Sequence, residues 1–327
     1  MKNVIEVTAA IIVKDGKVLA ARRGPGKHLE GYWEFPGGKL EENESPESCL
    51  ERELKEEFNI ASTVGGYIGE SVYDYGEKVV RLLGYEVQHT GGEFELVDHE
   101  ELRWLKIDQL TDVTWAPADI PLVEQYEARA RALGYYSTRA VEYCRETSEF
   151  VMGDLYRPFL KYLSPVAHIL DLGCGSGRDS KAFRKLGHNV TSVDGSAEIA
   201  AWASVFTGHT VEVKTFEQLE YQEEFDGVWA SASLLHCPET QLRGVIQKIL
   251  VALKDEAVAY MSFKWGDSAS VDDLGRYFTN QTTHSLRLIL ESIKDTEILE
   301  LWDSEAMLRG QPQRWACAIV RKRGGKT

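Results

Sequence analysis

The sequence contains no apolar run that approaches the roughly 20 residues needed to span a bilayer. Its first residues lack the hydrophobic segment of a secretory signal. The five cysteines are odd in number, scattered along the chain and without the spacing of a zinc site or a disulfide framework. These absences predict a soluble protein of a reducing compartment, the cytoplasm, with no membrane partner.

An excess of basic residues is also missing. The chain has 37 Lys and Arg against 52 Asp and Glu, which gives a formal net charge of −15. Residues 1–130 hold 26 acidic and 14 basic side chains, whereas residues 131–327 hold 26 and 23. Proteins bind nucleic acids through basic surfaces that neutralise phosphates, so an RNA or DNA partner is disfavoured. The acidic residues of the first part fit a site for a divalent cation instead.

The predicted secondary structure changes character near residue 130, and a chain of this length accommodates two domains. In the first part, strands are expected at residues 7–13, 17–21, 79–87 and 94–96, with turns at residues 15–16 and 91–92. A helix over residues 120–133 is expected to end at Gly134. We therefore predict an α/β chain of two domains, residues 1–130 and residues 131–327.

Beyond residue 134, strands and helices alternate. Strands are expected at residues 169–172, 189–193, 225–230 and 257–263, and a helix at residues 178–186 separates the first two. Such alternation is typical of a doubly wound parallel sheet with helices on both faces.

A strongly signalled helix begins after Ser45 in the first part. Serine is a favoured N-cap residue, and Pro46 suits the first helical position. Apolar residues recur at every fourth position, at Leu50, Leu54 and Phe58, which predicts a buried stripe.

Acidic residues crowd a neighbouring face of this helix. Glu53, Glu56 and Glu57 are spaced i, i+3 and i+4, where like charges destabilise an isolated helix. A bound Mg²⁺ or Mn²⁺ reverses that effect, because hard cations bind several carboxylate oxygens at once. The spacing therefore predicts a metal site.

The segment that contains this helix resembles the signature of the Nudix hydrolases. Five residues separate Gly38 from Glu44, and seven more precede residues 52–60, Arg-Glu-Leu-Lys-Glu-Glu-Phe-Asn-Ile. The one departure is Asn59, where the family usually has glycine. Asparagine is the next-best residue for a left-handed backbone, so the departure does not threaten the chemistry.

The resemblance covers nearly all of residues 1–130 and points to the MutT-type and the CTP and oxidised-nucleotide pyrophosphohydrolases. It also rests on residues 22–23, 33–38 and 116–121. It implies an α/β/α sandwich with a mixed sheet, and hydrolysis of a nucleoside triphosphate to a monophosphate and pyrophosphate by a metal-activated water. The metal ligands that it implies are Glu53, Glu56, Glu57 and the carbonyl of Gly38.

Further site residues follow from the same resemblance. An additional acid or base lies six residues before a late tryptophan, which makes it Asp98 before Trp104; a carboxylate at a strand edge is, however, often only solvated. Phe35 is expected to stack on the nucleobase, and Arg23 to reach its edge or the phosphates. Asp119 matches the position that reads the base edge, and an alternative or additional role is to cap the following helix.

A glycine-rich loop marks the second domain. Residues 169–177, Ile-Leu-Asp-Leu-Gly-Cys-Gly-Ser-Gly, join an apolar strand to three alternating glycines and a helix. Glycines let the backbone approach a ligand, and the helix N-terminus favours a carboxylate. Asp194, at the end of the next strand, is placed to accept both hydroxyls of a ribose. A dinucleotide-binding domain is the rival interpretation, but its fingerprint is Gly-x-Gly-x-x-Gly.

The loop resembles motif I of class I S-adenosylmethionine-dependent methyltransferases. Residues 225–236 and the paired segments 297–302 and 314–321 look like later strands of that family. The resemblance covers roughly residues 135–323 and implies a Rossmann-like domain with a seven-stranded, mostly parallel sheet. The donor-site residues that it implies are Asp171, Gly173, Gly175, Gly177 and Asp194.

Three further residues are candidates in this domain. Tyr136 belongs to a Tyr-x-x-x-Ala-x-x-Tyr helix that often covers the donor site of small-molecule methyltransferases. Phe216 packs on the adenine or, equally, belongs to the core. His236 lies where catalytic residues can fall, although a histidine there is more often a capping or core residue. The signatures of DNA amino- and cytosine C5-methylating enzymes are absent, which favours a small-molecule acceptor.

Together these features predict a bifunctional enzyme that hydrolyses a normal or modified nucleoside triphosphate and methylates a small acceptor. Two alternatives stay open. One domain could be a sensor that binds its nucleotide or S-adenosylmethionine without turnover, or the methyltransferase could act on RNA. The complete set of three helix carboxylates argues against a non-catalytic first domain, because degenerate relatives tend to lose them.

Overall fold

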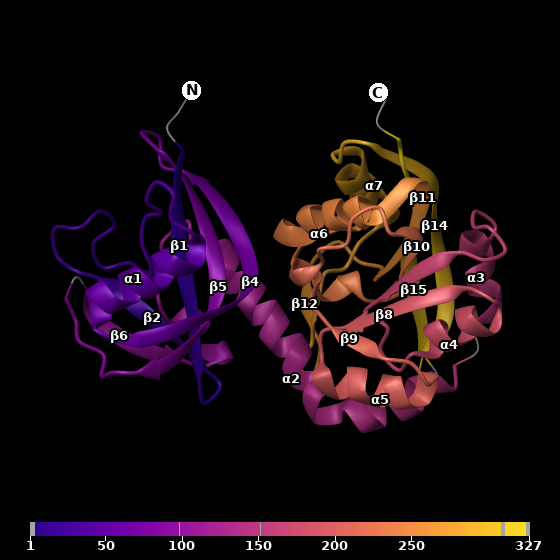
Figure 1. The fold of residues 1–327 in the computed structure, drawn as a ribbon, viewed down its shortest axis with the longest axis horizontal. Coiled ribbons are helices and arrows are strands. Elements are labelled where there is room, and N and C mark those ends of the chain that lie inside the picture. The colour runs from indigo at the N-terminus through magenta and orange to yellow at the C-terminus, as the bar shows by residue number, and fades with distance from the viewer. Residues whose placement is uncertain (1–3, 98, 151, 309–310, 325–327) are drawn as a thin grey trace. The chain divides into compact units, whose positions relative to one another are not determined.

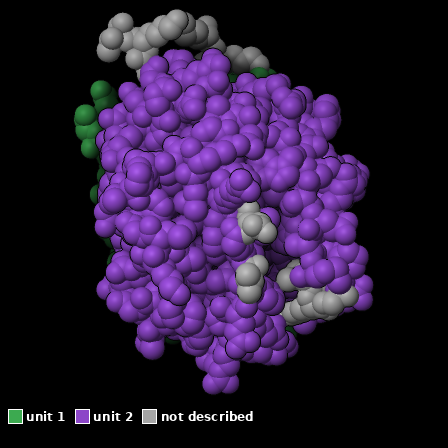
Figure 2. Space-filling model, turned by 90° about the vertical axis from the view of Figure 1, so that its right-hand side faces the viewer, with its two compact units in different colours: residues 1–127 green, residues 128–327 purple. Residues whose placement is uncertain are grey.

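The computed structural model describes residues 4–97, 99–150, 152–308 and 311–324. The chain divides into two compact units, Met1–Glu127 and Ala128–Thr327, which Figure 2 shows in different colours. Helix α2 (Ile120–Ser148) begins in the first unit and ends in the second (Figure 1). In the part of the chain that the structure describes, no helix is both long and apolar enough to cross a membrane.

Six strands make up the sheet of the first unit. They are β1 (Val4–Lys14), β2 (Lys17–Arg23), β3 (Trp33–Glu34), β4 (Ala61–Asp74), β5 (Val79–Gly91) and β6 (His99–Leu105), with a 3-10 helix, η1 (Ile107–Asp112), after β6. Their order is β3-β2-β1-β5-β4, and β6 pairs with β2. β1 and β5 are parallel and the other pairs antiparallel, so the sheet is mixed, as predicted. The turn between β1 and β2 has positive φ at Asp15 and Gly16, which a tight hairpin requires.

Helices lie on both faces of this sheet (Figure 1). α1 (Pro46–Phe58) packs its apolar stripe against Ile12 of β1. Side chains alternate along a strand, so Ile11 points to the opposite face. There, a Cβ added to Gly84 of β5 would lie 3.0 Å from Leu122 of α2 and 3.2 Å from Ile11. The first unit is therefore the predicted α/β/α sandwich.

The prediction of one strand in the first unit is wrong. Residues 94–96 form no strand, because the backbone N–H groups of Glu95 and Val97 donate to the carbonyls of Phe58 and Glu57, at 3.0 and 3.3 Å. The segment is thereby tied to the end of α1 instead of to the sheet. The strand that pairs here is β6, and β4, which the sequence pattern does not reveal, forms an edge of the sheet.

The helix expected to end at Gly134 continues to Ser148. A Cβ added at Gly134 would meet nothing within 4 Å, and a glycine inside a helix costs only about 1 kcal/mol relative to alanine. Ala140 and Cys144 beyond it are buried, and this packing outweighs the low helix propensity of one glycine. The helix is kinked at Arg139, whose φ of −121° and ψ of 17° are not helical.

The second unit contains a seven-stranded sheet in the order β14-β15-β11-β10-β7-β8-β9. Its strands are β7 (His168–Leu172), β8 (Asn189–Asp194), β9 (Val211–Val213), β10 (Phe225–Ala230), β11 (Leu253–Lys264), β14 (Thr296–Leu308) and β15 (Gln311–Lys322). Neighbours from β9 to β11 are parallel, and β15 is antiparallel to both β11 and β14. The mostly parallel sheet and its terminal strand pair are therefore present as predicted.

Helices flank this sheet and make the unit doubly wound. They are α3 (Gly153–Leu160), α4 (Arg178–Lys185), α5 (Ala197–Thr207), α6 (Glu239–Ala252) and α7 (Thr283–Glu291), with short 3-10 helices η2 (Phe216–Gln218) and η3 (Leu234–His236) and a small strand pair, β12 (Ser270–Val271) and β13 (Tyr277–Phe278). The chain leaves β7 for β8 on one side and returns to β10 on the other. This reversal opens a crevice at the carboxyl ends of β7 and β10, where ligands bind in such sheets.

Candidate active sites

The first candidate site is built on helix α1, which is capped at both ends. Ser45 Oγ accepts a hydrogen bond from the backbone N–H of Ser48 at 3.2 Å. Asn59 ends the helix with φ of 54° and ψ of 26°, so the left-handed backbone expected there is confirmed. The buried stripe sets the rotation of α1 about its axis and thereby the directions in which Glu53 and Glu57 point.

Gly38 lies directly against the carboxylate of Glu53. A Cβ added to Gly38 would lie 2.0 Å from Glu53 Cδ and 2.2 and 2.4 Å from its two oxygens. Only glycine therefore leaves room for this carboxylate. The Gly38 carbonyl, a predicted metal ligand, accepts hydrogen bonds from the backbone N–H and the hydroxyl of Thr8, at 2.8 and 3.2 Å.

Arg52 offsets the negative charge on α1 in this structure. Its guanidinium lies 2.9 Å from Glu44, 2.8 Å from Glu53 and 3.3 Å from Glu56, and its hydrogen bonds lower the pKa of Glu44 to about 2. Among the described residues, no three His, Cys, Asp or Glu side chains are already gathered around one metal position. The chemistry of the donors still fits a hard divalent cation, since one helix carries three carboxylates and Gly38 leaves space for that of Glu53.

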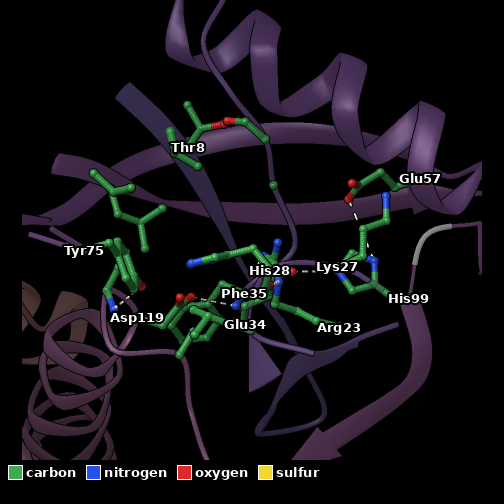
Figure 3. A pocket seen from close by; sticks show the side chains of 18 of the residues that line it. Thr8, Arg23, Lys27, His28, Glu34, Phe35, Glu57, Tyr75, His99 and Asp119 are labelled. Carbon is green, nitrogen blue, oxygen red and sulfur yellow. Dashed lines mark hydrogen bonds and ion pairs between the residues drawn. The ribbon is translucent and has the colours of Figure 1, made fainter. Parts of the chain in front are cut away.

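A cavity of about 250 Å³ lies beside the helix. In Figure 3, Glu57 and His99 lie at one side of it and Asp119 and Tyr75 at the other. Among the predicted site residues, its lining brings together Arg23, Phe35, Gly38, Glu57 and Asp119. Glu53 and Glu56 do not line it.

Asp119 is a buried carboxyl group at the start of α2. One of its oxygens accepts a hydrogen bond from the backbone N–H of Phe35 at 2.9 Å. Burial, together with nearby Glu34, raises its pKa well above the usual range. Its backbone carbonyl accepts from Leu122 and Val123, both at 2.9 Å, so Asp119 also occupies the cap position of the helix.

Phe35 and Arg23, the other two residues predicted to contact the nucleotide, are engaged by neighbouring side chains. The ring of Phe35 is 3% exposed and packs on Trp115 with centroids 4.9 Å apart, so only a small part of it faces the cavity. The guanidinium of Arg23 pairs with Glu34, and its Nε donates to the carbonyl of His28 at 2.6 Å.

His99 and Glu34 are lining residues that the sequence analysis misses. His99 is buried, and its Nε2 donates to Glu34 at 2.9 Å, since a carboxylate can only accept. The Nδ1 atom lies 4.0 Å from Glu57. The only signal in the sequence is that His99 follows the candidate base Asp98, which lies outside the described residues.

The second candidate site begins at the glycine loop after β7. Gly173, Gly175 and Gly177 have φ of 71°, 54° and 74°, a region that favours glycine. A Cβ would lie 2.5 Å from the side chain of Ser233 at Gly173 and 3.3 Å from the Tyr143 hydroxyl at Gly175. At Gly177 it would instead meet α5, so this glycine serves the packing of two helices.

Two predicted aspartates hold the loop. Asp194, at the end of β8, accepts hydrogen bonds from the backbone N–H groups of Gly175 and Ser196, at 2.9 and 3.0 Å, and burial raises its pKa to about 6. Asp171 is buried and accepts from the Ser180 hydroxyl at 2.5 Å. Burial and then the charge of Asp179 raise its pKa above the usual range.

Asp179 is a further site residue that the sequence analysis misses, although it follows the third glycine closely. Its carboxylate accepts hydrogen bonds from Arg178 at 2.6 Å, Tyr156 at 2.7 Å and Trp229 at 2.8 Å. Burial opposes its ionisation, but Arg178 and these hydrogen bonds lower its pKa on balance. The group anchors the start of α4 beneath the loop.

A cavity of about 500 Å³ occupies the crevice next to the loop. Gly173 and Gly175 line one part of it, and Tyr136 and Tyr143 reach it from α2. The rest of the lining includes Tyr260, Ser262, Lys264, Arg276, Phe278, Trp315 and Cys317. Phe216 is not part of this lining and packs against the hydrophobic core, which corresponds to the second of its two predicted roles.

His236 lines the same cavity with both ring nitrogens engaged. Its Nδ1–H donates to the carbonyl of Tyr277 at 2.9 Å, because a carbonyl can only accept. The Nε2 therefore accepts from the hydroxyl of Tyr136, also at 2.9 Å. Burial lowers the pKa of His236 to about 4, so the ring is neutral near pH 7.

Known proteins resemble both domains of the chain. The NUDIX domain family matches residues 3–126, and a methyltransferase domain family matches residues 169–256. The CTP pyrophosphohydrolase of Escherichia coli is 39% identical over 126 residues, 38% of this chain and 93% of that protein. The 8-oxo-dGTP diphosphatase of Proteus vulgaris is 39% identical over 93 residues, 28% of this chain and 83% of that protein.

Among solved structures, the Burkholderia thailandensis 1,6-didemethyltoxoflavin-N1-methyltransferase matches with a TM-score of 0.51 and 19% identity, over 62% of this chain and 90% of that one. At this identity the match shows the fold alone. Together with the glycine loop and the sheet order, it places the second unit in the methyltransferase fold. The chain therefore belongs to the Nudix hydrolase family through its N-terminal domain, and its second unit has a methyltransferase fold and matches a methyltransferase domain family over residues 169–256.

Proposed function

We propose that the chain carries two activities. The first domain hydrolyses a normal or modified nucleoside triphosphate to a nucleoside monophosphate and pyrophosphate. The second transfers a methyl group from S-adenosylmethionine to a small molecule. The five cysteines are all unpaired and buried, in keeping with our proposal that the protein works in the reducing cytoplasm.

The observation that carries the hydrolase proposal is the cavity with Glu57 of the carboxylate helix at one side and Asp119 at the other, and with Arg23 also in its lining. Glu53, Glu56 and Glu57 would hold Mg²⁺ or Mn²⁺, which supplies phosphate neutralisation and an activated water. In this reaction a water oxygen bonds to one phosphorus atom and loses a proton. The bond between that phosphorus and the oxygen that bridges the α and β phosphates breaks. Asp98 is the proposed acceptor of that proton.

The other end of the cavity is proposed to recognise the base. Asp119 presents a buried carboxyl group whose raised pKa favours the neutral form, which can donate as well as accept a hydrogen bond. Arg23 and the exposed part of Phe35 lie beside it. The relatives are named for CTP and for 8-oxo-dGTP, and we propose a substrate of that nucleotide class.

Pyrophosphate release tests this proposal. Wild type, Glu57→Gln and Glu51→Gln are compared with CTP, 8-oxo-dGTP and the common nucleoside triphosphates, with Mg²⁺ or Mn²⁺ present. Glu51 is an exposed residue of the same helix and is the matched control. We expect Glu57→Gln to lose at least about 100-fold in kcat, about 2.7 kcal/mol, while Glu51→Gln matches wild type. Release that is absent from wild type, or unchanged in Glu57→Gln, would overturn the proposal.

The methyltransferase proposal rests on the donor loop at the crevice. Gly173 and Gly175 would pass along S-adenosylmethionine, Asp194 would bind its ribose, and Tyr136 would cover it. The methyl carbon bonds to the acceptor's lone pair while its bond to sulfur breaks and S-adenosylhomocysteine leaves. Much of the rate acceleration of such a displacement comes from holding the donor and the acceptor in the correct relative position. We propose that His236 acts by holding the Tyr136 hydroxyl.

A small acceptor is favoured because the cavity has a volume of about 500 Å³ and adjoins the donor loop directly. The test is transfer of radiolabelled methyl groups from S-adenosylmethionine to deproteinised cell extract. We expect label in small molecules with wild type and with Asp255→Ala, an exposed control, and loss with Asp194→Ala. Donor binding without any labelled product would favour a sensor, and label in added RNA would favour a nucleic-acid substrate.

A further inference from the structure

His99 occupies an unusual place in the cavity of the first domain. Its side chain is 5% exposed and lies between two acidic residues from different parts of the chain. Nε2 is 2.9 Å from Glu34 on β3, and Nδ1 is 4.0 Å from Glu57 on α1. Apart from that approach to Glu57, Nδ1 has no hydrogen bond to any described residue.

The ring of His99 is fixed by packing as well as by hydrogen bonding. It stacks on Phe58 with ring centroids 5.0 Å apart and an interplanar angle of 21°. Phe58 is itself fully buried in the core under α1. The imidazole therefore cannot swing away from either carboxylate without leaving this stack.

The two carboxylates belong to different tasks under the proposed function. Glu57 is a proposed metal ligand, and Glu34 forms an ion pair with Arg23, a proposed contact of the nucleotide. Arg23, Glu34, His99 and Glu57, all labelled in Figure 3, thus form one continuous row along the cavity. His99 is the member that joins the base end of the row to the metal end.

We infer that His99 is a positioning residue, which sets the places of Glu57 for metal binding and of Glu34 and Arg23 for base recognition. The inference rests on the proposed nucleotide hydrolase function. It predicts that removal of the imidazole weakens metal binding and base discrimination together, although the two effects arise at opposite ends of the cavity.

Three substitutions separate the two contacts. His99→Phe keeps an aromatic ring on Phe58 but removes both nitrogens. His99→Gln places an amide nitrogen near the position of Nε2 and preserves the contact with Glu34. His99→Asn places its amide near the position of Nδ1 and preserves the approach to Glu57. His284→Asn, an exposed histidine of the second domain, is the control.

Two quantities are measured on the full chain: the affinity for Mn²⁺ by calorimetry without nucleotide, and the ratio of kcat/KM for CTP and 8-oxo-dGTP. We expect His99→Phe to lose about tenfold in Mn²⁺ affinity and to shift the nucleotide ratio several-fold. His99→Gln should retain the nucleotide ratio better than the Mn²⁺ affinity, and His99→Asn the reverse. Thermal unfolding of each variant shows how much of the change is general destabilisation.

Wild-type values for both quantities in His99→Phe would overturn the inference. The inference would also fail if, in all three variants, Mn²⁺ affinity and the nucleotide ratio changed only in proportion to the fall in unfolding temperature. Loss of packing alone would explain that pattern. Mn²⁺ binding requires no turnover. An inactive wild type in which His99→Phe still weakens Mn²⁺ binding would therefore refute the proposed hydrolase reaction while leaving the positioning of Glu57 intact.

Discussion

At the scale of single residues, the two sites depend on glycines that leave room for a functional group. Gly38 gives space to the carboxylate of Glu53, and Gly173 gives space to the side chain of Ser233. In both places a methyl group would overlap the neighbouring side chain. Each site also contains a buried carboxyl group with a raised pKa, Asp119 in the first and Asp194 in the second, and such groups tend to gather at functional sites.

Gly38→Ala should abolish most pyrophosphate release with little loss of fold. The added Cβ would lie within 2.4 Å of the Glu53 carboxylate, which must then move. We expect a fall of about 100-fold in kcat/KM, about 2.7 kcal/mol. Gly91→Ala is the control, because a Cβ there meets nothing within 4 Å. Equal activity of the two variants would show that the Glu53 position is not critical.

Asp194 should make the methyltransferase domain less stable as pH rises. Its folded pKa of about 6 lies above the ordinary aspartate value of 3.8, so the folded state holds the proton more tightly. That contribution is complete below pH 4 and is lost as pH rises through 6, up to about 3 kcal/mol. In urea unfolding without ligand, we expect Asp194→Asn to flatten the decline between pH 4.5 and 7.5. An identical pH profile in the variant would contradict this account.

At the scale of elements, α1 combines two faces with opposite requirements. One face is buried in the core, whereas the other presents carboxylates that repel one another and that Arg52 partly neutralises. The caps at Ser45 and Asn59 satisfy backbone groups at the two helix ends. This capping stabilises a helix that repulsion between its carboxylates destabilises.

Asn59→Ala and Asn59→Gly should differ in stability although both remove the same side-chain contacts. Both lose the hydrogen bonds to Lys55 and Glu95, but only glycine adopts φ of 54° without strain. We expect the glycine variant to be more stable than the alanine variant by about 1 kcal/mol in denaturant unfolding. Ser45→Ala, at the other end, should cost about 1 kcal/mol. Equal stabilities of the two Asn59 variants would mean that this end of α1 frays.

At the scale of the whole molecule, each of the two cavities is lined by residues of one unit. The smaller cavity is lined within Met1–Glu127, and the larger one within Ala128–Thr327. A ligand that binds only the folded state stabilises the unit that contains its site.

S-adenosylhomocysteine should therefore raise the melting temperature of the methyltransferase transition alone. At a concentration 100 times its dissociation constant, the stabilisation is about 2.7 kcal/mol. Differential scanning calorimetry of the full chain should show one transition that moves with this ligand, and Asp194→Ala should remove the shift. A single transition that moves as a whole would instead show that the two units unfold together.

Local sequence was sufficient to predict α1, its caps, the glycine loop and the strands that follow one another in the second domain. In those segments the deciding forces act over a few residues: helix capping at Ser45, alternation of apolar side chains, and the positive φ that glycine permits. The fold of each domain followed from these signals and from the resemblance that its motif carried.

Only the tertiary structure decided which residues meet. Residues 94–96 leave the sheet because α1 offers them backbone carbonyls, and α2 passes Gly134 because buried residues beyond it pack well. His99 joins Glu34 to Glu57 through contacts between distant parts of the chain. Such contacts leave no periodic trace in the sequence, because they depend on the angles at which whole elements pack.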